Sequence, residues 1–121
     1  MIAVIDDDKS VRNSVKTFLR SAGYRVETFE SAETFLESGA ATDTGCLILD
    51  VRMPGMDGLE LQAHLNEGNS QLPIIFITGH DNGTLRQRLI QAGAVEMLRK
   101  PFAPNALLST VQMVLSREAQ S

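Results

Sequence analysis

Short apolar runs alternate with segments of helical periodicity along the whole chain. Two of these runs are continuous, Ile2 to Ile5 and Cys46 to Leu49, and each ends on a carboxylate. An uninterrupted apolar run of this length is typical of a strand that is buried on both faces, as in a parallel sheet. The expected strands are 2–5, 24–29, 46–50, 73–77 and 94–98.

Each expected strand is followed by a segment in which apolar side chains recur at helical spacing. Asp8 or Ser10 is expected to cap the first helix and Ser31 the second. The remaining helices are expected at 58–67, at 81–92 and from Pro104 onward. Five strand–helix repeats predict parallel strands joined by right-handed crossovers. Because a closed barrel needs eight such units, we expect an α/β fold of three layers, a doubly wound five-stranded sheet with five helices.

The totals describe one globular domain. With 121 residues, 43% of them hydrophobic, the chain can bury its own core. Residues 1–117 are expected to form the domain and 118–121 to begin a linker or tail. A net charge of −4 disfavours nucleic-acid binding by this segment itself. The lone Cys46 excludes an intramolecular disulfide and is expected to be buried. The sequence shows neither a signal peptide nor an apolar run of transmembrane length, so we expect a cytoplasmic location and no membrane contact.

Carboxylates follow two of the expected strands at the same edge of the sheet. Asp6 and Asp7 follow the first strand, and Asp50 ends the third. If these strands are neighbours, their carboxylates converge, and like charges so close together are costly unless a cation lies among them. A site made only of oxygen ligands, few of them from protein, is typical of Mg²⁺. Asp8 is expected to cap a helix instead.

Two further polar residues end strands at this edge. Lys100 follows the fifth strand, where its long side chain can reach Asp50. It precedes Pro101, and a cis Lys100–Pro101 bond would aim the side chain inward. Thr78 follows the fourth strand, and its hydroxyl could donate to a phosphoryl oxygen or only cap the next helix.

These motifs, taken together, resemble the receiver domain of bacterial two-component response regulators. The chain has Asp6-Asp7 after an apolar strand, DVRMPGMDG from Asp50 to Gly58, Thr78-Gly79, and Lys100-Pro101-Phe102. The likeness spans essentially the whole chain and keeps the motifs in order. It implies a flavodoxin-like sheet with strand order 2-1-3-4-5.

The resemblance also implies a role for each site residue. Asp50 is similar to the phosphoacceptor, a carboxylate nucleophile. Asp7 and Asp50 resemble direct ligands of Mg²⁺ (or Mn²⁺), with the backbone carbonyl of Arg52 as the third protein ligand and Asp6 acting through water. Thr78 and Lys100 resemble the groups that hold phosphoryl oxygens.

Other positions would modulate the site rather than form it. The side chains of Arg52 and His80 would flank the route of an attacking water, or would be idle at the surface. Family members usually couple the Thr to an aromatic residue at the position that holds Met97 here. Met97 could fill the same pockets with softer selectivity. His64 is expected at the surface.

The function implied by the resemblance is signalling. A sensor histidine kinase would phosphorylate Asp50, and the surface of helix 81–92 with strand 94–98 would switch, forming a homodimer or partner contact. The domain would be no enzyme beyond catalysing its own phosphorylation and dephosphorylation. The motifs look most similar to receivers of FixJ/NarL-like transcriptional regulators, in which a separate C-terminal domain binds DNA.

Three alternatives stay open. One is a stand-alone receiver without a DNA-binding output. Another is a Mg²⁺-dependent phosphohydrolase that forms an aspartyl phosphate, which would need a general acid two residues after Asp50, where Arg52 stands. The third is a flavin-binding module, which would need a phosphate-binding loop after the first strand, where the carboxylates of 6–8 would repel phosphate.

Overall fold

The computed structural model of the chain describes residues 1–79 and 83–119, with side chains described to residue 116 in the last helix. These residues form five parallel strands in the order β2-β1-β3-β4-β5. The strands are β1 (Ile2–Ile5), β2 (Val26–Phe29), β3 (Cys46–Asp50), β4 (Ile74–Thr78) and β5 (Glu96–Arg99). The predicted fold class and strand order are therefore confirmed.

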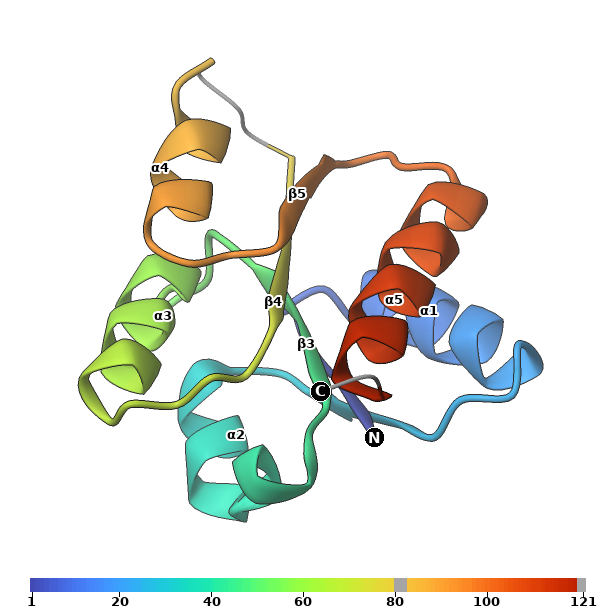
Figure 1. Cartoon of the computed structure of the whole chain (residues 1–121), viewed down its shortest axis with the longest axis horizontal. Helices are drawn as coiled ribbons and strands as arrows, with labels where there is room; N and C mark the ends of the chain where they lie inside the picture. The colour runs from blue at the N-terminus through green and yellow to red at the C-terminus, as the bar shows by residue number, and fades with distance from the viewer. Residues whose placement is uncertain (80–82, 120–121) are drawn as a thin grey trace.

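Helices cover both faces of this sheet, as Figure 1 shows. The α-helices are α1 (Lys9–Ser21), α2 (Ala32–Ser38), α3 (Gly58–Glu67), α4 (Leu85–Gln91) and α5 (Pro104–Ala119), and a 3₁₀ helix, η1 (Ala40–Asp43), follows α2. Helices α1 and α5 lie on one face, and α2, α3 and α4 lie on the other (Figure 1). The result is the predicted three-layer arrangement.

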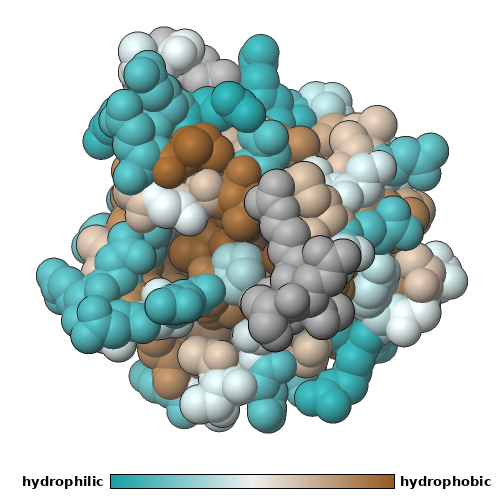
Figure 2. Space-filling view, in the orientation of Figure 1, coloured by the Kyte–Doolittle hydropathy of each residue, from teal (hydrophilic) through white to brown (hydrophobic). Residues whose placement is uncertain are grey.

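The core lies on both faces of the sheet. β1, β3 and β4 are buried along their full length, as their apolar runs predict. In Figure 2, hydrophobic residues lie in the middle of the view, and mostly hydrophilic residues cover the outer sides of the helices. Cys46 is buried, as expected. No helix in the described part of the chain is long and apolar enough to cross a membrane.

Capping side chains explain why several helices begin where they do. Asp8 accepts hydrogen bonds from the backbone N–H groups of Ser10 and Val11, so it caps α1 as predicted. Ser31 caps α2 in the same way. At α3, Asp57 and Glu60 form a reciprocal capping box, and this helix has the predicted bounds.

The predicted start of the fourth helix is wrong. We expected a helix from Asp81, but α4 begins at Leu85, and residues 80–82 lie outside the described part of the chain. Gly83 has a φ of 85°, a left-handed conformation that no α-helix contains. Strand ends are shifted by one or two residues as well, since β2 begins at Val26 and β5 spans Glu96–Arg99.

Candidate functional site

Three carboxylates meet where β1 and β3 end. Asp6 and Asp7 directly follow β1, and Asp50 is the last residue of β3. Because these strands are neighbours and parallel, one carboxylate oxygen from each residue lies within 4.8 Å of the other two. Asp6 and Asp50 are buried, whereas Asp7 is exposed. The predicted convergence of Asp6, Asp7 and Asp50 is therefore what the structure has.

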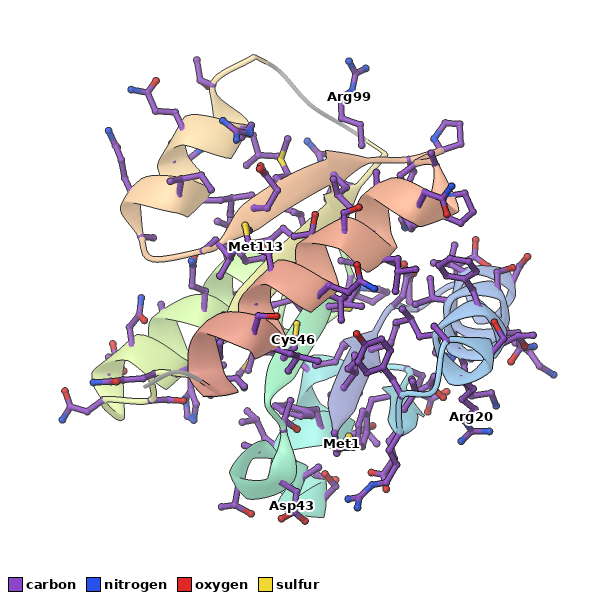
Figure 3. All side chains as sticks on the ribbon, turned by 45° about the vertical axis from the view of Figure 1, so that its right-hand side comes forward. Met1, Arg20, Asp43, Cys46, Arg99 and Met113 are labelled. Carbon is purple, nitrogen blue, oxygen red and sulfur yellow. The ribbon has the colours of Figure 1, made fainter. Side chains whose placement is uncertain are left out.

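This edge is the end of the sheet that carries the carboxyl ends of all strands. In Figure 3, Arg99 at the end of β5 lies near the top of the view, and Met1 before β1 lies in its lower half. Lys100 follows Arg99, and its positively charged side chain contacts the carboxylates. Its Nζ donates to Asp6 Oδ2 at 2.8 Å and to Asp50 Oδ2 at 3.4 Å. The Lys100–Pro101 bond is cis.

The lysine was expected to reach Asp50, and its shorter contact is with Asp6. Asp6 has no exposed surface, and its other carboxylate oxygen accepts from the backbone N–H of Asp8. A fully buried carboxylate is costly without partners, so the ammonium group lies closest to the more deeply buried of the two. The ammonium group of Lys100 therefore bridges the carboxylates of Asp6 and Asp50.

Burial and charge together perturb the ionisation of the site. Removal from water, with the negative charge of Asp6 added, raises the pKa of Asp50 from 3.8 to about 6, although Lys100 opposes the shift. Burial alone would lower the pKa of Lys100. The hydrogen bond to Asp6 and the charges of Asp50 and Asp6 outweigh it, so the pKa of Lys100 lies above 10.5. The edge therefore carries more negative charge than its own ammonium group offsets.

A cleft of about 280 Å³ opens over these groups. Its lining residues are Asp6, Asp7, Asp8, Asp50, Arg52, Gly79 and Lys100. Thr78 ends β4 beside the cleft and is buried. Its carbonyl accepts a hydrogen bond of 2.7 Å from the backbone N–H of Lys100. The ends of β4 and β5 are thus joined next to the carboxylates.

The loop after Asp50 returns to pack against it. The backbone N–H of Arg52 donates to Asp50 Oδ1 at 3.4 Å, while the Arg52 side chain is exposed. Gly58, the first residue of α3, donates its N–H to the carbonyl of Val51. A Cβ at position 58 would clash with the carbonyl of Asp50 and meet the ring of Phe76 at 3.0 Å. Glycine is required because α3 begins in contact with the strand end.

Of the remaining predicted positions, Met97 and His64 do not line the cleft. Met97 is buried in the core cluster that also includes Leu85 and Leu89 of α4. His64 is exposed on α3, as expected. His80 falls outside the described residues.

Sequence reasoning missed Arg12, whose Nη1 donates to the backbone carbonyl of Asp6 at 2.7 Å. The available signal was its place one helical turn after the cap residue Asp8, which turns its side chain toward the end of β1.

The donor set fits a small divalent cation. Two buried carboxylates and one exposed carboxylate supply only oxygen atoms, which are the ligands that Mg²⁺ and Mn²⁺ prefer. The exposed Asp7 leaves room for water in such a coordination shell. Burial, with the negative charge of Asp6 added, raises the pKa of Asp50. Three grouped carboxylates face the single ammonium group of Lys100, and a cation would offset the remaining negative charge.

Comparison with known proteins gives consistent matches over nearly the whole chain. The family model described as "Response regulator receiver domain" matches residues 2–112. The response regulator protein TodT of Pseudomonas putida is 42% identical over 120 residues, which cover 99% of this chain and 53% of that protein. The transcriptional regulatory protein FixJ of Azorhizobium caulinodans is 40% identical over 119 residues, covering 98% of this chain and 56% of that protein.

Solved structures agree with these matches. The response regulator StyR superposes with a TM-score of 0.90 and 47% identity, over 98% of this chain and 60% of that chain. The chain thus spans little more than half the length of the curated relatives it matches.

Proposed function

Because this chain belongs to the family of response regulator receiver domains, we propose that Asp50 accepts a phosphoryl group from a sensor histidine kinase. The observation that carries the proposal is the position of Asp50. Its buried carboxylate ends β3 within 4.8 Å of two other carboxylates and 3.4 Å from an ammonium group. A nucleophile, a cation site and a fixed positive charge are the parts that phosphoryl transfer requires.

In the proposed reaction an oxygen of Asp50 attacks the phosphorus of a phosphohistidine. The new bond joins that oxygen to phosphorus, the P–N bond breaks, and its electron pair remains on the histidine ring. Attack requires the ionised carboxylate, so the negative charge that burial disfavours is the reactive form. Lys100 Nζ, which donates to Asp50 Oδ2, would donate to a phosphoryl oxygen in this reaction.

Asp7 and Asp50 would bind Mg²⁺ or Mn²⁺ directly, the backbone carbonyl of Arg52 would be the third protein ligand, and Asp6 would act through water. The cation would supply positive charge that offsets the carboxylates and the phosphoryl oxygens. Asp6 accepts the 2.8 Å hydrogen bond from Lys100 Nζ, so it would also orient the ammonium group toward Asp50.

We infer that Thr78 and Lys100 hold the phosphoryl oxygens in the product. Both lie at adjacent strand ends that a backbone hydrogen bond joins. Arg52, whose side chain is exposed at the cleft, and His80 are proposed to flank the route of an attacking water and so to set the lifetime of the phosphoryl group. The domain would catalyse only its own phosphorylation and dephosphorylation.

The signal is proposed to leave through α4 and β5. A hydroxyl at Thr78 drawn toward phosphoryl oxygens would shift the segment that leads into α4. Met97 lies in one cluster with Leu85 and Leu89, so it can transmit such a shift without an aromatic ring at its position. We infer that this surface forms a homodimer when Asp50 is phosphorylated.

The relatives extend beyond the matched region, and FixJ is a transcriptional regulatory protein. We therefore propose that residues 1–117 form a receiver that controls transcription from the cytoplasm, that 118–121 begin a linker, and that DNA binding belongs to a separate domain. A stand-alone receiver is the alternative. The full-length protein, tested for DNA binding with and without phosphorylation, discriminates the two.

The direct test of phosphorylation is intact mass. Wild type and Asp50→Asn are incubated with acetyl phosphate, with Mg²⁺ or with a chelator. We expect one phosphoryl adduct on the wild type in Mg²⁺, and none on the variant or with the chelator. An adduct of the same yield on Asp50→Asn would overturn the assignment.

A further inference from the structure

Each backbone and side-chain polar group of Asp6 is hydrogen-bonded. Its N–H donates to the carbonyl of Phe29 on β2 at 3.2 Å. One carboxylate oxygen accepts from the backbone N–H of Asp8 at 2.9 Å, and the other accepts from Lys100 Nζ at 2.8 Å. The remaining group, the carbonyl oxygen, accepts from Arg12 Nη1 at 2.7 Å. Because Asp6 is fully buried, each of these contacts offsets a desolvation cost.

Arg12 contacts the residues on both sides of Asp7. Its side chain binds the carbonyl of Asp6, and its backbone N–H donates to the carbonyl of Asp8 at 3.1 Å as α1 begins. The Asp8 side chain in turn caps the helix. Side chains on a helix lean toward its N-terminus, so an arginine one turn after the cap reaches back to the end of β1. Asp7 is thus the middle residue of a short segment that one arginine holds at both ends.

The position of Asp7 depends on this backbone contact. Asp7 is exposed, whereas Asp6 and Asp50 are buried, so packing fixes its side chain least of the three. The peptide unit between Asp6 and Asp7 is planar, so a hydrogen bond that fixes the carbonyl of Asp6 also fixes the N–H of Asp7. Without Arg12 the buried carbonyl loses this partner, and any rotation of the peptide that finds another one displaces Asp7.

From these contacts we propose that Arg12 is a positioning residue for the cation site, which holds the peptide between Asp6 and Asp7 so that the Asp7 carboxylate faces Asp50. This role rests on the proposed binding of Mg²⁺ or Mn²⁺ by Asp7 and Asp50. Arg12 is not among the residues that line the cleft, so it acts through Asp7 and not by touching the cation. Removal of a partner that orients a metal ligand weakens metal binding by about 10–100-fold.

The sign of the effect separates positioning from charge. The positive guanidinium group of Arg12 repels a divalent cation, so removal of its charge would by itself strengthen cation binding. Loss of the hydrogen bond to Asp6 would weaken cation binding, because the Asp7 carboxylate is no longer directed at the site. The two causes therefore predict opposite changes in the dissociation constant of the cation.

Arg20 provides a matched control on the same helix. Its Nη2 donates to the carbonyl of Val26, the first residue of β2, at 3.0 Å. It lies in the last turn of α1, at the other end of the helix from the carboxylates. Arg12→Met and Arg20→Met therefore remove the same side chain, the same charge and one hydrogen bond to a strand backbone, but only the first does so at the site.

Binding of Mn²⁺ to the metal-free protein is measured by the electron paramagnetic resonance signal of the free ion. We expect the dissociation constant to rise about tenfold in Arg12→Met, to rise less in Arg12→Lys, which keeps a charged donor, and to stay unchanged in Arg20→Met. Asp7→Asn should lose most of the binding, which identifies the site that is measured. In phosphorylation by acetyl phosphate, followed by intact mass, Arg12→Met should need about tenfold more Mg²⁺ for half of its maximal rate and keep most of that rate at saturating Mg²⁺.

The outcomes separate this role from the proposed function. If wild type binds Mn²⁺ and Arg12→Met binds it equally or more tightly, the positioning role is wrong and the cation site stands. If wild type binds no Mn²⁺, the cation site of the proposed function fails and the role of Arg12 fails with it. An equal rise in Arg20→Met would mean a general loosening of the fold, which also contradicts the role. If urea denaturation shows that Arg12→Met does not fold, Arg12→Gln, whose uncharged side chain is two bonds shorter, decides by the same criterion.

Discussion

The centre of the sheet and its carboxyl edge are made by the same strands, but they bury different kinds of side chain. β1, β3 and β4 are buried over their whole length and are apolar up to their last residues. At the edge, the buried groups are Asp6, Asp50 and Thr78. The apolar centre stabilises the fold through removal of surface from water. The edge places like charges together in a buried setting, which opposes folding.

This difference locates the part of the molecule in which a buried ionised group costs stability. The pKa of Asp50 is raised to about 6, so the ionised form, which the proposed reaction needs, is the one that the folded state disfavours. Perturbed ionisation of this kind is common at functional sites. Five predictions test the contrast, beginning with the change expected to be largest.

The centre is tested by removing its largest buried ring on β4. Phe76 has no exposed surface, and Phe76→Ala leaves a cavity beside Gly58. We expect a loss of about 3–5 kcal/mol in the free energy of unfolding, measured by urea denaturation. Met113→Ala, at a side chain 40% exposed, is the matched control and should lose far less. Equal losses would mean that burial at the centre of the sheet does not govern stability.

At the edge the sign reverses. Without metal at pH 7, Asp50→Asn removes a buried charge and keeps the shape of the side chain. We expect the variant to be more stable than wild type by about 1–3 kcal/mol, since each unit of pKa shift corresponds to about 1.4 kcal/mol. The same denaturation experiment measures this, and a destabilised variant would contradict the contrast.

The pH dependence sharpens this prediction. Between the ordinary pKa of 3.8 and the folded value of about 6, Asp50 holds a proton more often in the folded state than in the unfolded state. Its contribution to stability is therefore fully present below the lower value and is lost as pH rises through about 6. The stability difference between Asp50→Asn and wild type should grow over this interval and stay level above it.

Divalent cations should offset part of the cost. At ten times its dissociation constant, Mg²⁺ should raise the free energy of unfolding of the wild type by about 1.4 kcal/mol. Asp7→Asn removes one of the three grouped carboxylates and should lose most of the response. Asp43→Asn, an exposed Asp outside the cluster, should keep it. A response of the same size in all three proteins would indicate nonspecific binding.

The smallest expected change in the free energy of unfolding concerns the N-terminal cap of α3, the helix that follows the loop after β3. Asp57 caps α3 through the hydrogen bond from the backbone N–H of Glu60 at 2.8 Å. Asp57→Ala should cost about 1 kcal/mol of stability in denaturation experiments, with or without Mg²⁺. Asp43→Ala, where no cap is lost, is the control and should cost less. A cost that appears only with Mg²⁺ would place Asp57 in the cation site instead.

Neighbouring helices show how far sequence alone could go. The bounds of α3 follow from local signals, a capping box at Asp57 and Glu60 and a glycine after the last turn, and they were predicted correctly. The start of α4 was not. The helix begins at Leu85, after Gly83 in a left-handed conformation, and its C-terminal end is held by side-chain amides of Gln62 and Asn66 from another helix. Amide contacts between elements leave no periodic pattern in a sequence.

The candidate site shows the same division. Strand ends and the resemblance were enough to bring Asp6, Asp7, Asp50 and Lys100 to one edge, because parallel strands present their carboxyl ends together. The partner choice of Lys100 could not be predicted, since it depends on which carboxylate is more deeply buried. Nor could the hydrogen bond from Arg12 to the backbone of Asp6, because one basic side chain on a helix has many possible partners.

The contact at Gly58 has a consequence for anyone who varies this protein. Because a side chain there would clash with the carbonyl of Asp50, position 58 is coupled to Asp50 through the backbone alone. Saturation mutagenesis should therefore return a single amino acid at this position even in a screen that selects only for correct folding. Transfer of the carboxylate cluster to another scaffold therefore requires a glycine at the position that corresponds to Gly58.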